Sequence, residues 1–372
     1  MNSGRKTYSG QVVYLFAFDL AYDTKRARIS TLLGQPLAQF NVDASKRAPR
    51  QLSFYRPQML RMPPLEERGP HGNICVERMV KLLPVGALSI TFRIPFEVEH
   101  IHDLIAYHNP AFANFTLLEE ATRLAEAVRV ELADYFIRPV ANLSEEAYTV
   151  FCVENPLPSP NGSPLKAEEW LETHRRQVAA VLTQEPDIGF LSEQEAEEST
   201  ARALSYYERD ILVVDWDAAL LVDERKNFQE TLYILELANL QLAELKAYDR
   251  ILDDALDRSY RDLAARGIAR RTEILRSLRE LRVDLARFSD ELSNITKFFG
   301  DWHLARIYQT ISSRFHLADW HHTLDEKLQT LDDLYAILNQ DRINRWMIAL
   351  EITIILLFII DLILLVLGLH PR

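Results

Sequence analysis

The sequence predicts an α+β domain over residues 1–225, long helices of the antiparallel coiled-coil type over 226–345, and one C-terminal transmembrane helix over 346–369. Three observations support this fold class. Short strand-like and helix-like patterns alternate before residue 225, and leucines recur at heptad spacing after it. A run of mostly apolar residues then fills 346–369, and it is long enough to cross a bilayer as a helix.

The charge and the cysteine content exclude several classes of protein. The chain has 372 residues and a formal net charge of −12. Because a net negative surface repels phosphate, we do not expect the whole surface to bind nucleic acid. Cys75 and Cys152 form no CxxC pair and have no histidine at zinc-ligand spacing, so we expect free thiols that pack in the core. The apolar run 12–18 is too short for a signal peptide and indicates a strand.

The N-terminal part alternates between two patterns. Strands are expected where β-branched and aromatic residues are dense between turn residues. These strands are 11–19, 51–61, 87–95, 147–154 and 210–216. Helices are expected where apolar residues recur every three or four positions. These helices are 24–33, 117–136, 167–182 and 193–207. Four prolines between Pro156 and Pro164 predict a loop.

Three long helices are expected after residue 226. The clearest heptad seam runs from Ile274 to Phe299, with apolar residues spaced alternately by four and three. A second seam occupies 228–265. The third begins at Leu324 and enters the apolar run without a proline or glycine, which predicts one helix from about Thr323 to Leu369. Breaks near Gly267 and Gly300 favour an antiparallel bundle within one chain. The same seams could also pair between chains, and both arrangements stay open.

The apolar run predicts a tail anchor. From Trp346 to Leu369 a helix would extend roughly 36 Å, which exceeds the hydrocarbon thickness of about 30 Å. Arg342 and Arg345 lie just before the run, whereas Arg372 alone follows it. This distribution of positive charge places the preceding residues in the cytoplasm. We therefore expect a single-pass membrane protein with its soluble body on the cytoplasmic side.

Two acidic residues interrupt the apolar run. Glu351 is near the expected cytoplasmic boundary, where its side chain can reach the headgroups. Asp361 is deeper, and a carboxylate in hydrocarbon costs a few kcal/mol. We expect Asp361 to be protonated, paired, or turned toward a helix of another copy or another protein. Glu351 and Asp361 are therefore candidates for association within the membrane.

Motifs of common enzyme classes are missing from the sequence. It contains no GxxxxGK[ST], GxGxxG, GxSxG or HExxH motif. Histidines and acids gather between Glu97 and His108, but they fit a solvated helix start better than a metal site. The tripeptide Asp-Trp-His occurs at 301–303 and 319–321, where we expect the tryptophans to pack and the aspartates to cap helices. We expect no enzymatic activity, cofactor, metal or small-molecule substrate.

Arginines are concentrated between Arg261 and Arg287. This segment holds eight arginines and four acids, a local charge of +4. Ion pairing with acidic stretches such as Glu193–Glu198 is the simpler interpretation, and contact with phosphate or RNA is the alternative. The candidate phosphate- or partner-binding residues are Arg266, Arg270, Arg271, Arg276, Arg279 and Arg282.

Seven positions in the segment 210–365 fit the pattern of a known family, and these are Trp302, Tyr308, Leu324, Lys327, Leu328, Leu350 and Glu351. On these positions the segment resembles the "required for meiotic nuclear division" family, as a divergent bacterial-type member. Asp325 and Glu326 replace the Leu-Asn pair expected before the lysine. The resemblance implies a domain without an assigned enzymatic activity. It also implies a likeness to organellar members that are oligomeric inner-membrane proteins supporting translation.

The leading functional hypothesis is a membrane-tethered, non-enzymatic scaffold or interaction protein. It would self-associate as a homo-oligomer through its coiled-coil and transmembrane helices, with the bilayer as its first partner. The alternative is a membrane-tethered factor that binds RNA or the ribosome through the basic face Arg261–Arg287 and supports translation.

Overall fold

The computed structural model describes two compact units. The described residues are 7–25, 29–39, 57–69, 72–83, 86–110, 112, 114–139, 143–158, 165–264, 283 and 302–366. The first unit comprises Met1–Ala247 and Phe288–His321, and the second comprises Tyr248–Arg287 and His322–Arg372. The expected boundary at residue 225 precedes the first long helix, whereas the first unit continues to Ala247.

The first unit is built on a nine-stranded mixed sheet in the order β11-β12-β13-β10-β1-β8-β7-β6-β5. The bounds of these strands are β1 Tyr8–Asp19, β5 Ala38–Gln39, β6 Gln58–Gly69, β7 Gly72–Leu82, β8 Ala87–Val98, β10 Glu145–Glu154, β11 Ala203–Leu204, β12 Ile211–Val214 and β13 Ala218–Asp223. All neighbours are antiparallel except β10 and β13. Two small sheets join β2 (Ala21–Thr24) to β9 (Phe136–Pro139) and β3 (Thr31–Leu32) to β4 (Gln35–Pro36).

The helices of the described part are α1 Leu117–Glu131, α2 Ala167–Thr183, α3 Glu193–Thr200, α4 Phe228–Ala264, α6 Trp302–Arg314 and α7 Leu317–Val366. Three short 3-10 segments, η1 Ile101–Tyr107, η2 Ala133–Tyr135 and η3 Arg225–Asn227, complete them. Local capping sets two of the helix starts. Thr116 accepts a hydrogen bond from the Glu119 amide, while the Glu119 carboxylate accepts one from the Thr116 amide. Ser192 caps α3 with a single hydrogen bond, which its side chain accepts from the Glu195 backbone amide.

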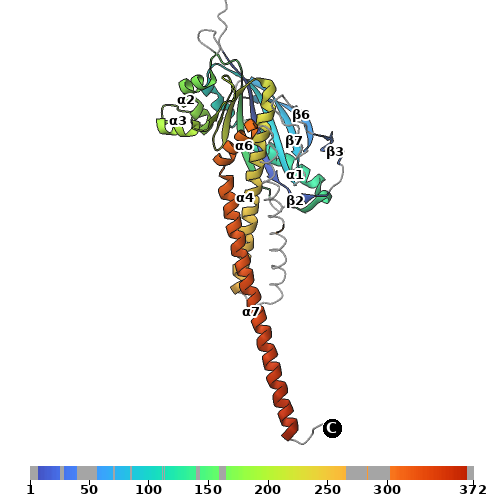
Figure 1. Cartoon of the computed structure of the whole chain (residues 1–372). Coiled ribbons are helices and arrows are strands. Elements are labelled where there is room, and N and C mark those ends of the chain that lie inside the picture. Colours follow the sequence, from blue (N-terminus) through green and yellow to red (C-terminus); the bar gives the residue numbers. More distant parts are fainter. Residues whose placement is uncertain are drawn as a thin grey trace, which may run out of the picture. The chain divides into compact units, whose positions relative to one another are not determined.

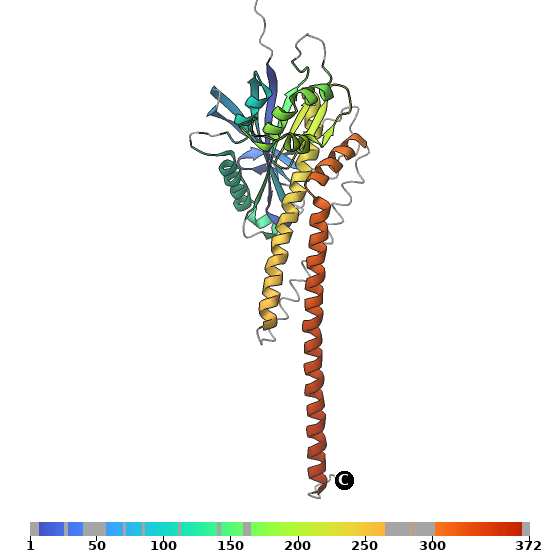
Figure 2. The same cartoon turned by 90° about the vertical axis from the view of Figure 1, so that its left-hand side faces the viewer.

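Helices cover both faces of the central sheet (Figures 1 and 2). Alternation along β1 sends Val12, Tyr14 and Phe16 to one face, where they share a hydrophobic core with η1, α1 and α2. Ala17 points to the opposite face and packs against Leu240 of α4. Because strands buried on both faces need apolar residues, the buried stretches 12–18 of β1, 150–153 of β10 and 218–222 of β13 are apolar throughout.

The first half of α4 is a central helix of this unit. Every described side chain from Phe228 to Ala247 is buried except Gln229 and Lys246, which are half-buried. Apolar residues lie on all sides of this stretch rather than along one seam, and Tyr233, Ile234 and Leu237 are examples. A helix that is apolar all round is stable only when it is covered all round.

The structure confirms several expected elements and corrects others. Helix α2 and the strands β1, β8 and β10 agree with expectation to within three residues. The prediction of a helix at 24–33 is wrong, because this range contains β3 instead. Leu33 and Gly34 have φ of 49° and 68°, which form a tight two-residue hairpin turn between β3 and β4. The helix expected at 193–207 ends at Thr200 instead, since Ala203 and Leu204 form β11 and pair with β12. Further along, the Asp210 carboxylate accepts hydrogen bonds from the Tyr206 and Tyr207 amides.

Two further corrections concern α1 and the cysteines. Helix α1 ends at Glu131 rather than at 136, and Phe136 begins β9, which pairs with β2. Cys152 is buried in β10 as expected, whereas Cys75 is exposed on β7, so core packing was wrong for that thiol. Both cysteines are free.

The second unit contains the end of α4 and most of α7. Lys327 of α7 forms ion pairs of 2.6 Å with Asp249 and Asp253 of α4. Leu252 of α4 and Leu324 of α7 are buried in the same unit. Helix α7 is continuous from Leu317 to Val366, as expected for the helix that enters the apolar run. The seam expected from Ile274 to Phe299 lies outside the described residues.

Candidate functional site: a charged cluster at the end of helix α6

A charged cluster with several hydrogen bonds and ion pairs surrounds Arg314, the last residue of α6. The apolar residues Leu304, Ile307 and Ile311 lie on the buried face of this helix, with spacings of three and four. Arg314 follows three positions later and is therefore carried to the same face, where only 8% of the residue remains exposed. A guanidinium in this position requires acceptors, because burial of an unpaired charge costs several kcal/mol.

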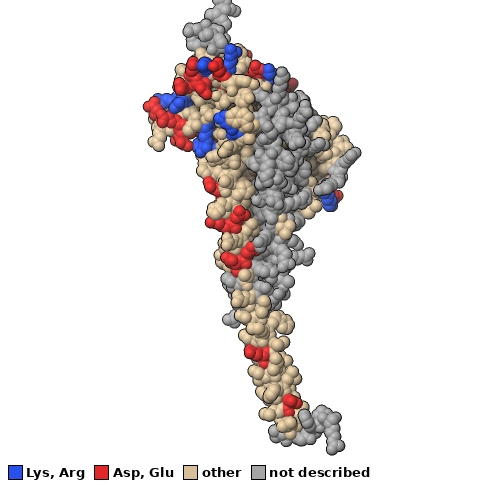
Figure 3. Space-filling view, in the orientation of Figure 1, with Lys and Arg blue, Asp and Glu red and all other residues tan. Residues whose placement is uncertain are grey.

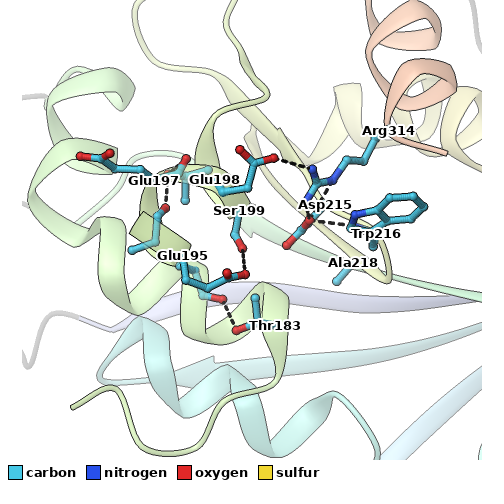
Figure 4. Close-up of polar contacts among 12 residues, drawn as sticks. Thr183, Glu195, Glu197, Glu198, Ser199, Asp215, Trp216, Ala218 and Arg314 are labelled. Carbon is cyan, nitrogen blue, oxygen red and sulfur yellow. Dashed lines mark hydrogen bonds and ion pairs between the residues drawn. The ribbon is translucent and has the colours of Figure 1, made fainter. Parts of the chain in front are cut away.

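Two carboxylates supply those acceptors (Figure 4). Oδ1 of Asp215 accepts hydrogen bonds from Nε of Arg314 at 3.0 Å and from one terminal nitrogen, Nη2. Oε1 of Glu198, from α3, accepts a hydrogen bond of 3.0 Å from Nη1. The cluster thereby joins the end of α6 to α3 and to the turn between β12 and β13.

The β12–β13 turn holds Asp215 from several directions. Its Oδ1 also accepts a hydrogen bond of 2.9 Å from the Trp216 amide, and its own amide donates to the Ala218 carbonyl at 2.9 Å. The buried Tyr148 hydroxyl donates to the carbonyls of Asp215 and Ala218 at 3.1 and 3.0 Å. Burial, followed by the negative charges of Asp215 and Asp217, raises the pKa of Tyr148 well above its usual value. Tyr148 is therefore a permanent hydrogen-bond donor in this turn.

Aromatic rings cover the outer side of the cluster. The guanidinium carbon of Arg314 lies 5.4 Å from the centre of the Trp216 ring, and the His316 ring stacks on Trp216 at 5.2 Å. His316 connects α6 to α7 with a positive φ of 51°. Its Nδ1 lies 2.8 Å from an oxygen of Asp319. Each nitrogen of the Arg314 guanidinium donates to a carboxylate. We therefore interpret this cluster as a structural contact that holds the end of α6 against α3 and the β12–β13 turn.

A second polar cluster lies between the sheet and α4. Lys81 of β7 and Glu236 of α4 form a close ion pair in which each side chain is at most 4% exposed. Ser89 of β8 donates a hydrogen bond to the other oxygen of Glu236. Burial lowers the pKa of Lys81, and the Glu236 carboxylate opposes that shift. This Lys81 cluster fixes the position of α4 on the sheet.

The candidate residues named from the sequence have different outcomes. Arg266, Arg270, Arg271, Arg276, Arg279 and Arg282 lie outside the described residues. Glu351 and Asp361 lie on the exposed part of α7. The structure brings neither Glu351 nor Asp361 into the Arg314 cluster. Neither the Arg314 cluster nor the Lys81 cluster was expected from the sequence. The available signal was a single charged residue in register with buried apolar ones, as in Ile307, Ile311 and Arg314.

The histidine-rich segment forms the beginning of η1. The His100 and His102 rings stack at 5.2 Å, and the His100 amide donates to an Asp103 oxygen at 3.0 Å. Among the described residues, no group of three or more histidines, cysteines or acids is arranged to hold a metal ion. The Asp103 carboxylate thus accepts the hydrogen bond of a backbone amide that has no partner within η1.

The repeated Asp-Trp-His tripeptides differ from expectation. Trp302 is 60% exposed, so packing inside a bundle was wrong for this residue. Its ring faces Arg306, whose guanidinium carbon is 4.9 Å from the ring centre, and it lies 6.4 Å from the Tyr206 ring. Asp301 lies outside the described residues, and Asp319 lies in the first turn of α7.

Asp19, at the end of β1, has an unusual acidity. Burial raises the pKa of this carboxyl group to about 7, and a hydrogen bond from the Ala21 backbone opposes the shift. Below about pH 7 the folded protein therefore favours the protonated form of Asp19, whereas the unfolded chain ionises near pH 4. Because the folded state binds more protons in this range, stability decreases as pH rises from about 4 to 7.

Asp19→Asn should accordingly stabilise the protein at high pH and not at low pH. A shift of about three pKa units corresponds to about 4 kcal/mol, and the gain should be smaller because part of Asp19 remains exposed. We expect a gain of roughly 1–3 kcal/mol at pH 8 and almost none at pH 4, measured by urea unfolding of the full chain in mild detergent. An equal gain at both pH values would contradict this assignment.

Comparison with known proteins places the first unit in a family. Residues 9–229 match the family model described as "Uncharacterized protein MJ0711, N-terminal domain". The uncharacterized protein MJ0711 of Methanocaldococcus jannaschii is 22% identical over 254 residues, which cover 68% of this chain and 76% of that protein. No solved structure matches the chain. The resemblance of 210–365 to the "required for meiotic nuclear division" family stays a prediction.

Proposed function

We propose that this chain, which belongs to the family of the MJ0711 N-terminal domain, is a membrane-tethered interaction protein without enzymatic activity. One observation carries the proposal. The segment Trp346–Leu365 of α7 is long and apolar enough to span a membrane, and none of it is buried. Soluble proteins rarely expose an apolar surface larger than a few hundred Å². Insertion into a bilayer removes this surface from water without any change in the helix.

The contrast with α4 strengthens the proposal. Both helices are rich in apolar residues, but the first half of α4 is buried within the first unit, whereas side chains such as Phe358 (75% exposed) and Leu357 (60% exposed) remain uncovered. Figure 3 shows that the surface of this last part of α7 is almost free of charge. A membrane is the solvent that suits such a surface.

The tether is a continuation of a packed helix. Lys327 of α7 is bonded to Asp249 and Asp253, and α7 then continues without a break through Trp346. We therefore propose that the membrane segment is held by the second unit without a flexible linker. We place the sheet domain in the cytoplasm, since Arg342 and Arg345 precede the segment in the sequence.

Exposed aromatic residues on the first unit support a role in interactions. Tyr206, Tyr207 and Trp302 are 41%, 53% and 60% exposed. The two tyrosine rings meet edge to face at 4.7 Å, and Arg306 lies over Trp302. Tyrosine, tryptophan and arginine are the residue types that contribute most to protein interfaces.

Flotation with phosphatidylcholine vesicles tests the tether. We expect the full chain to float with the vesicles and to resist alkaline extraction. Ile355→Arg combined with Ile359→Arg should abolish both properties, because each charge at the centre of a span costs about 2.5–3.5 kcal/mol. Both side chains are exposed on α7, so these changes should leave the packed units intact.

Val130→Arg is the matched control for this test. Val130 is 74% exposed on α1, outside the apolar segment, and the variant should float like the unmodified protein. A full chain that stays with the soluble fraction would remove the basis of the proposal. So would a double variant that floats as well as the control.

The alternative hypothesis of RNA or ribosome binding through Arg261–Arg287 depends on the sequence alone. Its six candidate residues, Arg266, Arg270, Arg271, Arg276, Arg279 and Arg282, lie outside the described residues. The exposed apolar segment Trp346–Leu365 lies within the described residues, and it favours the membrane tether as the primary role.

A further inference from the structure

Asp361 has no hydrogen-bonding neighbour along its own helix. The residues one turn to either side of it on α7 are Leu357, Phe358, Leu364 and Leu365, which are all apolar and exposed. Trp346–Leu365 is the one candidate span among the described residues. If that span lies in a bilayer, as proposed above, none of these neighbouring side chains can hydrogen-bond to Asp361, and a group outside the helix can supply that bond.

The face of α7 that carries Asp361 differs from the face used within the chain. Leu324 and Leu331 are both 3% exposed and pack inside the second unit. An ideal helix turns about 100° per residue, which places Asp361 about 100° from Leu324 and about 120° from Leu331 around the axis. Packing among the described residues therefore leaves the Asp361 face uncovered.

Apolar residues continue this face as a stripe suited to helix pairing. The stripe consists of Leu350, Ile354, Leu357, Asp361 and Leu364, with alternating spacings of four and three. All five residues are exposed. This spacing matches the a and d positions of a heptad, at which a single polar residue sets register and oligomeric state.

We propose that two copies of this chain associate in the membrane through this stripe, with their Asp361 carboxyl groups hydrogen-bonded to each other. A carboxyl group can donate and accept when protonated, so two identical groups complement each other. Copies inserted in the same direction place Asp361 at the same depth, which allows this contact. The second copy thus satisfies a group that the bilayer leaves unsatisfied. This inference depends on the proposed membrane tether.

The mass of the full chain in detergent micelles, measured by light scattering over a range of detergent concentrations, tests the pairing. We expect the unmodified protein to self-associate and Asp361→Leu to weaken association by about 3- to 30-fold. Asp361→Asn should retain association to within about 3-fold, because an amide also donates and accepts. Glu351→Leu is the matched control, since it removes the other acid of the span, which lies outside the stripe, and it should behave like the unmodified protein.

Three results would overturn the proposal. They are a monomeric unmodified chain at all detergent concentrations, equal association of Asp361→Leu and the unmodified protein, and equal weakening by Glu351→Leu. A chain that floats with vesicles but stays monomeric would overturn the pairing alone and would indicate a span of another protein as the partner of Asp361. A chain that does not float would overturn the tether.

Discussion

Replacing Lys81 by methionine should lower the free energy of unfolding by about 3–5 kcal/mol, one of the largest effects expected in this protein. Lys81 forms an ion pair with Glu236 in a position where both side chains are at most 4% exposed. Methionine fills a similar volume but leaves the Glu236 carboxylate with the Ser89 hydroxyl as its hydrogen-bond donor in this cluster. The cost comes from a buried negative charge that has lost its partner, rather than from lost packing.

The double variant Lys81→Met/Glu236→Leu separates these two causes. Because it removes both charges, it should recover most of the lost stability, and buried pairs replaced in this way are often neutral or stabilised. Urea unfolding of the full chain in mild detergent, followed by tryptophan fluorescence, measures all variants in one cycle. A double variant as unstable as Lys81→Met would show that the cost arises from packing.

An exposed ion pair provides the control for this cycle. Lys166 and Glu208 are 3.3 Å apart, and their side chains are 55% and 76% exposed. Lys166→Met removes a similar charge and should cost less than about 1 kcal/mol. A similar cost at Lys81 and Lys166 would contradict the importance of burial.

Of the three expected long helices, the structure describes two, α4 and α7, and both were predictable from local patterns. Helix α7 runs from Leu317 to Val366 because apolar residues recur without a proline or glycine, and this signal is local. The sequence also predicted α4, but the seam residues alone did not predict its burial. The expected seam contains Leu232, Leu235, Leu242 and Leu245. Tyr233, Ile234 and Leu237 lie off that seam and are buried, so the apolar residues outside the seam carried the missing information.

Strands with charged residues were harder to predict. In β7, Val76, Val80 and Leu82 alternate with residues of the other face, but Arg78 interrupts the pattern. Arg78 is buried because its guanidinium donates to Glu120 of α1 and to the Pro63 carbonyl. The partner that makes this position tolerable is distant in the sequence, so no local pattern identifies the strand.

The sequence distance to the partner also decides which candidate residues could be predicted. Asp361 could be identified from the sequence because its cost comes from the apolar residues directly around it. Lys81 and Glu236 are 155 positions apart, and Arg314 and Asp215 are 99 apart. Only the folded sheet and its helices bring such residues together, and their sequences show just an isolated charge in an apolar stretch.

Arg314→Met should destabilise the first unit by about 2–4 kcal/mol, the second of the two largest effects. The change removes both Arg314 donors from the Asp215 carboxylate, which then keeps the hydrogen bond from the Trp216 amide. Asp215 is 4% exposed, so its charge would be poorly solvated. We expect a smaller loss than the upper limit for buried pairs, because the neighbouring Trp216 is 50% exposed and water is close.

Conservative and matched variants identify the origin of that loss. Arg314→Lys keeps the charge, but an ammonium group lacks the planar guanidinium that donates to Asp215 and Glu198 at once. This variant should therefore lose about half as much stability as Arg314→Met. Arg306→Met is the control on the same helix, since Arg306 contacts the exposed Trp302 ring, and such a cation–π contact contributes about 0.5–1 kcal/mol. Limited proteolysis of the α6–α7 connection provides a second readout. Faster cleavage in Arg314→Met than in Arg306→Met would show that the Arg314 contacts hold the end of α6 in place. Equal cleavage and equal stability of the two variants would contradict this role of Arg314.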